Sequence, residues 1–152
     1  DFFEKDMKKL IILATAMLIA GSFQAKADND RIIKFNELPA AAQQFTQKYF
    51  PNEKVAYTKM ERDFLEVQYE VMFSNGSKVE FLKNGEWKDV DCKYNSVPAE
   101  LVPAQIASYV EQNYKGAAIV QIDRDTRDYE VKLTNGLELT FDLRFNIIDI
   151  DD

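Results

Sequence analysis

The sequence contains nearly the same hairpin twice. Residues 69–81 read YEVMFSNGSKVEF and residues 129–141 read YEVKLTNGLELTF, so the two segments match at an offset of 60 residues. They share their alternating apolar positions and an Asn-Gly pair between the two strands. Self-similarity at a fixed period indicates a duplicated structural unit, so the chain is expected to build one supersecondary structure twice.

A helical pattern precedes each hairpin. Pro39 lies in a Leu-Pro-Ala triplet that matches the Val-Pro-Ala triplet of Pro103 at an offset of 64, so the first copy holds four extra residues near Glu61 to Leu65. Proline suits the first helical position, where its missing N–H would have no partner. An apolar stripe at helical spacing follows in each copy: Leu38, Ala42, Phe45 and Tyr49, then Val102, Ile106, Tyr109 or Val110, and Tyr114.

About four strands follow each helix. We expect them at 55–60, 67–73, 79–83 and 86–91, and again at 119–123, 129–133, 137–143 and 146–150. Short turns require antiparallel pairing, and helices that precede a sheet ribbon indicate an α+β fold. The expected architecture is two tandem helix-plus-antiparallel-sheet repeats, residues 36–94 and 100–152. They form one curved antiparallel sheet with the helices packed on one face.

The residues around Asn-Gly decide the register of the hairpins. A two-residue loop would place Phe73 opposite Lys78, whereas a three-residue loop places Val71 opposite Val79 and keeps one face apolar. Because a register error moves every side chain to the other face, burial favours the three-residue loop. We therefore predict a type I turn with a G1 bulge and positive φ at the loop glycines: Gly76, Gly136 and, in a third loop of this kind, Gly85.

The first residues have the composition of an export signal. A basic start at 7–9 precedes an apolar run, residues 10–20, which is too short to span a bilayer and has the length of a signal-peptide core. The triplet Ala25-Lys26-Ala27 fits the small-x-small cleavage rule, so we expect cleavage before Asp28. Residues 1–6 are then upstream sequence, 7–27 a signal peptide and 28–152 a single domain of a periplasmic or secreted protein.

The expected mature chain is acidic. Residues 1–27 hold three of the 26 acidic and four of the 19 basic side chains, which leaves 23 acids, 15 bases and a net charge of −8. This charge disfavours nucleic acid and anionic membranes as partners, and we expect no membrane insertion. A partner attracted by charge is expected to be a basic protein or peptide. The oligomeric state stays open, because the edge strands of an open sheet can pair.

One face of the expected sheet is not covered by helices. It leans acidic, and like charges lie opposite each other at Glu70 and Glu80 and at Asp128 and Asp142. Either this face is solvated and tolerates the repulsion, or it is kept acidic for a basic partner. The candidate partner-binding residues on it are Glu70, Met72, Glu80, Lys88, Glu130, Lys132, Glu138, Thr140 and Ile148.

The residues that most enzymes use are missing. The chain has no histidine, the commonest general base and zinc ligand, and no G-x-S-x-G, H-E-x-x-H or glycine-rich phosphate loop. The single cysteine, Cys92, cannot form an intrachain disulfide and is expected in the core or at an edge. The segment with Asp123, Asp125 and Asp128 lacks the glycine and distal glutamate of an EF-hand loop. We expect no catalytic residue, no metal site and no cofactor.

These features together resemble a known family. The Leu/Val-Pro helix starts, the spaced aromatic residues and the Y-E-V…N-G…F hairpins recur in the same order over about residues 32–152. This arrangement resembles the PepSY-like, β-lactamase-inhibitor-like family of secreted bacterial proteins. The resemblance implies tandem repeats, a curved antiparallel sheet with helices on one side, and a concave sheet face that holds a target enzyme. It carries over neither a specific inhibitory loop nor a particular target.

Three functions remain open from the sequence. The first is a non-catalytic periplasmic protein-binding or inhibitor-like module that uses the uncovered sheet face, with Met72 and Ile148 as apolar anchors. The second is a small-ligand or cell-envelope sensor with a cleft lined by Tyr57, Trp87 and Tyr94. The third is a small hydrolase with paired carboxylates, which requires a cleft that holds both groups.

Overall fold

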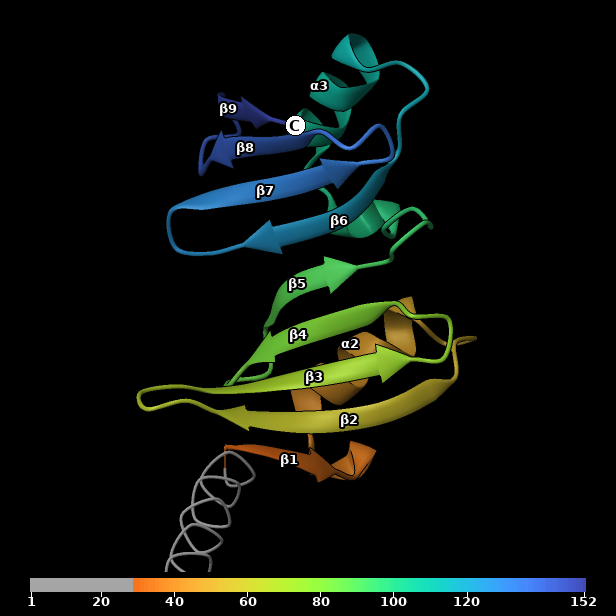
Figure 1. The fold of residues 1–152 in the computed structure, drawn as a ribbon, viewed down its shortest axis with the longest axis vertical. Coiled ribbons are helices and arrows are strands. Elements are labelled where there is room, and N and C mark those ends of the chain that lie inside the picture. Colours follow the sequence, from red (N-terminus) through yellow and green to blue (C-terminus); the bar gives the residue numbers. More distant parts are fainter. Residues whose placement is uncertain (1–28) are drawn as a thin grey trace, which may run out of the picture.

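The computed structural model describes residues 29–152, which build one open antiparallel sheet (Figure 1). The nine strands lie side by side in chain order, and this arrangement confirms the α+β fold. The expected upstream residues and signal peptide, 1–27, lie outside the described residues. The strands are β1 Asp30–Ile33, β2 Val55–Arg62, β3 Val67–Phe73, β4 Lys78–Leu82, β5 Trp87–Asp91, β6 Ile119–Arg124, β7 Asp128–Leu133, β8 Glu138–Asp142 and β9 Ile147–Asp151.

Two α-helices cover the same face of the sheet (Figure 1). They are α2, Ala40–Tyr49, and α3, Ala104–Asn113. Pro39 and Pro103 immediately precede them with extended ψ angles of 145° and 138°, so each proline lies one position before the expected one. The extended ψ turns the chain into the helix, and the fixed φ of proline favours that geometry. Two short 3₁₀ turns that the sequence did not predict, η1 Phe35–Glu37 and η2 Ala99–Leu101, come before these prolines.

The two helices pack on the sheet in the same way. The rings of Phe45 and Phe81 lie 5.4 Å apart at an interplanar angle of 84°. Their counterparts Tyr109 and Phe141 lie 5.4 Å apart at 86°. Edge-to-face contacts of this kind add about 0.5–1.5 kcal/mol to the burial of the rings. The predicted apolar stripes therefore do face the sheet and anchor both helices by equivalent contacts.

The predicted hairpin register is confirmed in both copies. Val71 pairs with Val79 and Val131 pairs with Leu139, so the apolar residues of both ribbons face the helices. The three loop glycines have the predicted positive φ: +88° at Gly76, +90° at Gly85 and +89° at Gly136.

A fourth loop of this kind has no glycine at the position with positive φ. Phe145 occupies the position that corresponds to Gly85 and has a φ of +67°, with its ring 5.5 Å from that of Tyr129. The strands expected at 137–143 and 146–150 are present, with bounds that differ by one residue. β8 ends at Asp142 and β9 begins at Ile147.

Strand β1 was also missed. It has four residues, of which only Ile33 is buried, and it pairs with β2 at the edge of the sheet. A segment this short with one buried residue shows no alternation of apolar and polar positions, which is the signal for a half-buried strand.

Candidate functional site

Strand pairing places one row of side chains across the whole uncovered face. Each residue in this row is paired with the next one on the neighbouring strand, so all of them share one side of the sheet. Six of its nine members are carboxylates. We call it the central row: Ile32, Lys59, Glu70, Glu80, Asp89, Asp123, Glu130, Thr140 and Asp149.

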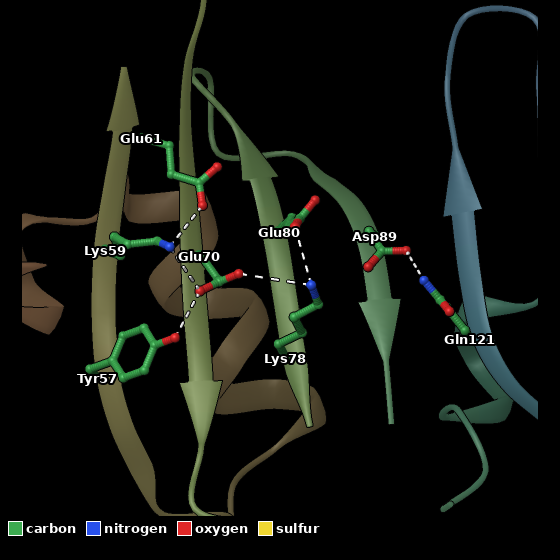
Figure 2. A network of polar contacts seen from close by, with 8 residues as sticks. All are labelled: Tyr57, Lys59, Glu61, Glu70, Lys78, Glu80, Asp89 and Gln121. Atoms are coloured by element: carbon green, nitrogen blue, oxygen red, sulfur yellow. Dashed lines mark hydrogen bonds and ion pairs between the residues drawn. The ribbon is translucent and has the colours of Figure 1, made fainter. Parts of the chain in front are cut away.

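The first half of the central row is neutralised by lysines (Figure 2). The buried Glu70 carboxylate lies 3.6 Å from Lys59 Nζ and 4.0 Å from Lys78 Nζ, and it accepts a hydrogen bond of 3.2 Å from the hydroxyl of Tyr57. Lys78 Nζ also lies 3.6 Å from Glu80. The expected Glu70–Glu80 repulsion is therefore present in the register but is offset by a lysine that contacts both carboxylates.

The pKa values reflect this pairing. Burial opposes the charged form of Lys59, yet its hydrogen bond with Glu61 and the charge of Glu70 raise its pKa above the usual range. Lys78 behaves alike, because Glu80 and Glu70 outweigh burial and raise its pKa. Burial and the nearby Glu70 charge raise the pKa of Tyr57. This half of the face is electrostatically satisfied within the chain.

The second half lacks these lysines. Asp123 stands where the first copy has Lys59, at an offset of 64 residues, and it pairs with Glu130 as Lys59 pairs with Glu70. Likewise, Glu138 stands where the first copy has Lys78. Within residues 29–152, all four ion pairs lie on β2–β4. Six carboxylates on the other half form what we call the acidic patch: Asp89, Asp123, Glu130, Glu138, Asp149 and Asp151. Asp128 and Asp142 lie opposite each other on the same face, as the sequence predicted.

Several carboxylates of the acidic patch resist ionisation. Burial, reinforced by the charge of Asp89 on the opposite strand, raises the pKa of Asp123 to about 6. Burial also raises the pKa of Asp89, with Glu80 adding to the effect and a 3.0 Å hydrogen bond from Gln121 opposing it. Partial burial and the charge of Asp128 raise the pKa of Glu130. An added cation would therefore favour the charged forms of all three groups.

Two bulges change which residues of β5 and β9 lie in the central row. Lys88 and Ile148 are the extra residues of the bulges in the β4–β5 and β8–β9 pairs. The pairing consequently places Asp89 beside Glu80 and Asp149 beside Thr140. Sequence reasoning assigned Lys88 and Ile148 to the face and missed both aspartates, because a bulge shifts the alternation by one residue.

The remaining candidate residues lie on both halves of the sheet. Met72 is partly exposed on β3 and pairs with Lys78, whereas Lys132 is exposed on β7 and pairs with Glu138. Ile148 is 58% exposed on β9. β3 and β9 are six strand spacings apart, about 30 Å, so Met72 and Ile148 cannot contact the same side chain of a partner.

The aromatic residues proposed for a cleft do not converge. Tyr57 pairs with Met72 on the uncovered face. Trp87 pairs with Phe81 on the helix side, where the guanidinium of Arg124 stacks 3.8 Å from its ring centre. Tyr94 is 91% exposed in the loop after β5. The three rings therefore do not line a common cleft.

The β2–β3 hairpin carries an exposed apolar tip that the sequence did not predict. It projects beyond the neighbouring turns (Figure 1), and its tip holds the four extra residues of the first copy. Phe64 and Leu65 are 94% and 87% exposed there. They line a hollow of about 540 Å³ together with residues of β3 and of the β4–β5 loop.

The other chemical features are structural. Cys92 is buried, and burial raises the pKa of its thiol to about 11, so it is a core residue as expected. In residues 29–152, no three or more Asp, Glu, Cys or His side chains are grouped so that they could hold one metal ion. No helix in this range is long and apolar enough to cross a membrane.

Fold and face together define a small duplicated α+β module with an uncovered, half-acidic antiparallel sheet. The chain belongs to the PepSY-like, beta-lactamase-inhibitor-like family, whose family model matches residues 67–149. This match confirms the resemblance seen in the sequence. A search of curated proteins finds no match.

Solved structures support the same assignment. A protein from Bacteroides thetaiotaomicron, described as periplasmic and proposed to be calcium-regulated, has 54% sequence identity and a TM-score of 0.81 over 83% of this chain and 99% of that one. A proposed periplasmic protein of the DUF2874 family from Bacteroides vulgatus has 51% identity and a TM-score of 0.79 over the same shares. A proposed periplasmic protein of unknown function, also from B. vulgatus, has 38% identity and a TM-score of 0.78 over 81% and 99%.

Proposed function

We propose that this protein is a non-catalytic periplasmic module that binds a basic protein or peptide through the acidic patch. The observation that carries the proposal is the exchange of Lys59 and Lys78 in the first copy for Asp123 and Glu138 in the second. The framework is the same in both copies, but within residues 29–152 only the first copy holds its carboxylates in ion pairs with lysines. Lys132 lies opposite Glu138 in the second copy without forming such a pair. A basic partner would form such pairs with the acidic patch.

Location and lack of catalysis have separate support. The relatives with solved structures are described as periplasmic, and residues 7–27 have the composition of an export signal. The chain has no histidine, and the family is described as inhibitor-like. The acidic charge disfavours nucleic acid and anionic membranes as partners.

The face is large enough for a stable complex. Nine strands at a spacing of about 4.8 Å give a face about 40 Å wide, and strands of four to eight residues make it about 20 Å high. A standard interface buries about 800 Å² on each partner. A partner of this size would cover the acidic patch and extend over part of the neutralised half.

The test is affinity capture from a periplasmic extract with charge-reversed variants. Glu130→Lys combined with Glu138→Lys reverses two exposed carboxylates of the acidic patch and should abolish capture of the basic partner. Glu70 is unsuitable for this purpose, because it is buried in the lysine network. Glu100→Lys with Glu111→Lys changes the net charge equally on the helix side and should leave capture unchanged. Equal capture by both double variants would refute the proposal.

Calcium can be added to the same experiment as a competitor of the basic partner. One solved relative is proposed to be calcium-regulated, and carboxylates are ligands that Ca²⁺ prefers. Millimolar Ca²⁺ at constant ionic strength should weaken capture by neutralising the acidic patch. Stronger capture with Ca²⁺ would instead indicate that the ion bridges the two proteins.

A further inference from the structure

The internal duplication shows what covers the last strand of a repeat. β5 ends the first repeat and β9 ends the second, and their pairing with the preceding strand is the same. Val79 pairs with Val90 as Leu139 pairs with Ile150, and both strands carry the bulge at the same place. The outer edge of β5 is paired with β6, whereas no strand within residues 29–152 pairs with the outer edge of β9 (Figure 1).

Burial differs accordingly at the two edges. Val90 is fully buried, and its partner across the β5–β6 pair is Ile122. Its counterpart Ile150 is 49% exposed, and the neighbouring Ile148 is 58% exposed. The outer edge of β9 thus presents unpaired backbone groups beside two apolar side chains, which is the arrangement that an added strand completes.

The charges on β9 restrict what can be added. Asp149 and Asp151 face the uncovered side, since they pair with Thr140 and Glu138. A second copy that paired its own β9 here would place these aspartates opposite one another, and like charges directly across a ladder are unfavourable. A strand with basic residues at these positions would instead form opposite-charge pairs.

We infer that the outer edge of β9 binds an extended segment of a basic partner as a tenth, antiparallel strand. The β5–β6 pair supplies the register, because Asp89, Val90 and Asp91 lie opposite Asp123, Ile122 and Gln121. Transferred to β9, an apolar residue lies opposite Ile150 and basic residues lie opposite Asp149 and Asp151. The recognised sequence is therefore basic, apolar, basic. This inference rests on the proposed function only in taking the partner to be basic.

The probe is a peptide made from this chain's own β6. Residues 117–126 with Gln121→Lys and Asp123→Lys keep the strand sequence that pairs with β5 and add the two basic residues. The unchanged 117–126 peptide is the matched control. We expect the lysine peptide to bind the full chain about tenfold more tightly, since two cross-strand pairs change from unfavourable or neutral to favourable.

Two further measurements separate strand addition from attraction by charge alone. Bound peptide should slow amide hydrogen exchange within residues 147–151, which binding elsewhere on the acidic patch would not do. Asp149→Lys with Asp151→Lys, two exposed positions, should reverse the order of the two peptides. Glu130→Lys with Glu138→Lys should keep the preference and the protection of β9.

The outcomes are distinct. Equal binding of both peptides, or binding without protection of residues 147–151, would overturn the inference and leave Asp149 and Asp151 as charges that merely prevent pairing. A dimer that the lysine peptide converts to monomers would identify a second copy as the occupant and also overturn it. The lysine peptide could fail to bind β9 while Glu130→Lys with Glu138→Lys still abolishes capture of the partner. In that case the proposed function holds, but strand addition at the outer edge of β9 is excluded.

Discussion

Asp123 shows how one residue changes the character of a face. It occupies the place of Lys59 in a repeated framework and lies opposite Asp89 where the two repeats meet. Burial and that neighbour raise its pKa to about 6, well above the range of an exposed aspartate. Asp123 is therefore under repulsion at neutral pH that a bound cation would relieve.

This gives a pH-dependent prediction for Asp123→Asn. The folded state binds the proton more tightly than the unfolded state, so the resulting stabilisation is fully present below about pH 4 and is lost as the pH rises through about 6. At pH 8, the variant should have a free energy of unfolding higher by about 1 kcal/mol, a value reduced for the partial exposure of the group. At pH 4 the variant and the parent should agree in urea denaturation.

Asp125→Asn is the control, because the pKa of Asp125 is shifted in the opposite direction from that of Asp123. The exposed Asp125 accepts hydrogen bonds from the backbone of Arg127 and Asp128, and these lower its pKa. Asp125→Asn should therefore not stabilise the protein at pH 8. An Asp123→Asn variant that gains as much stability at pH 4 as at pH 8 would show that Asp123 is not under this repulsion.

Gly85 and Gly136 have almost the same φ, so alanine substitutions at the two positions distinguish the cost of backbone strain from the cost of overpacking. An added Cβ at Gly136 meets nothing within 4 Å, whereas at Gly85 it would lie 2.9 Å from Cβ of Ala41 on α2. We expect Gly136→Ala to lower the free energy of unfolding by about 1 kcal/mol through the left-handed backbone alone. Gly85→Ala should cost about 2–4 kcal/mol because overpacking adds to the strain. Equal losses in chemical denaturation would mean that α2 does not approach the β4–β5 loop closely.

At the scale of elements, the glycine-marked hairpins were predictable, but the bulges within the β4–β5 and β8–β9 pairs were not. Burial alone selected the three-residue loops at Gly76 and Gly136, because only that register keeps each face consistent. The loop at Phe145 lacked the glycine signal, and the bulges at Lys88 and Ile148 reversed the alternation after them. Two aspartates of the candidate site, Asp89 and Asp149, were missed for this physical reason.

The β2–β3 hairpin gives a prediction for a single element. Phe64→Ser with Leu65→Ser should change the free energy of unfolding by less than about 0.5 kcal/mol, since both side chains are almost fully exposed. Thermal unfolding of the double variant measures this. A loss above 1 kcal/mol would show that another molecule or another part of the chain buries the tip in solution.

At the scale of the whole molecule, duplication provides the scaffold and divergence between the copies provides the candidate site. The helices, ribbons and aromatic contacts are equivalent in the two repeats. The uncovered face is not equivalent, since the ion pairs within residues 29–152 all lie on β2–β4 and none of them includes a carboxylate of the acidic patch. The sequence predicted an acid-leaning face, but only the pairing of all nine strands showed which half of it is uncompensated.

Amide chemical-shift mapping with the captured basic partner tests the central claim most directly. Low salt is required, because the screening length falls from about 10 Å at 0.1 M to about 3 Å at 1 M. We expect the perturbed amides to concentrate on β5–β9 around the acidic patch and to return to their free positions at 1 M salt. Perturbations centred on α2 and α3, or on β2–β4, would contradict the account.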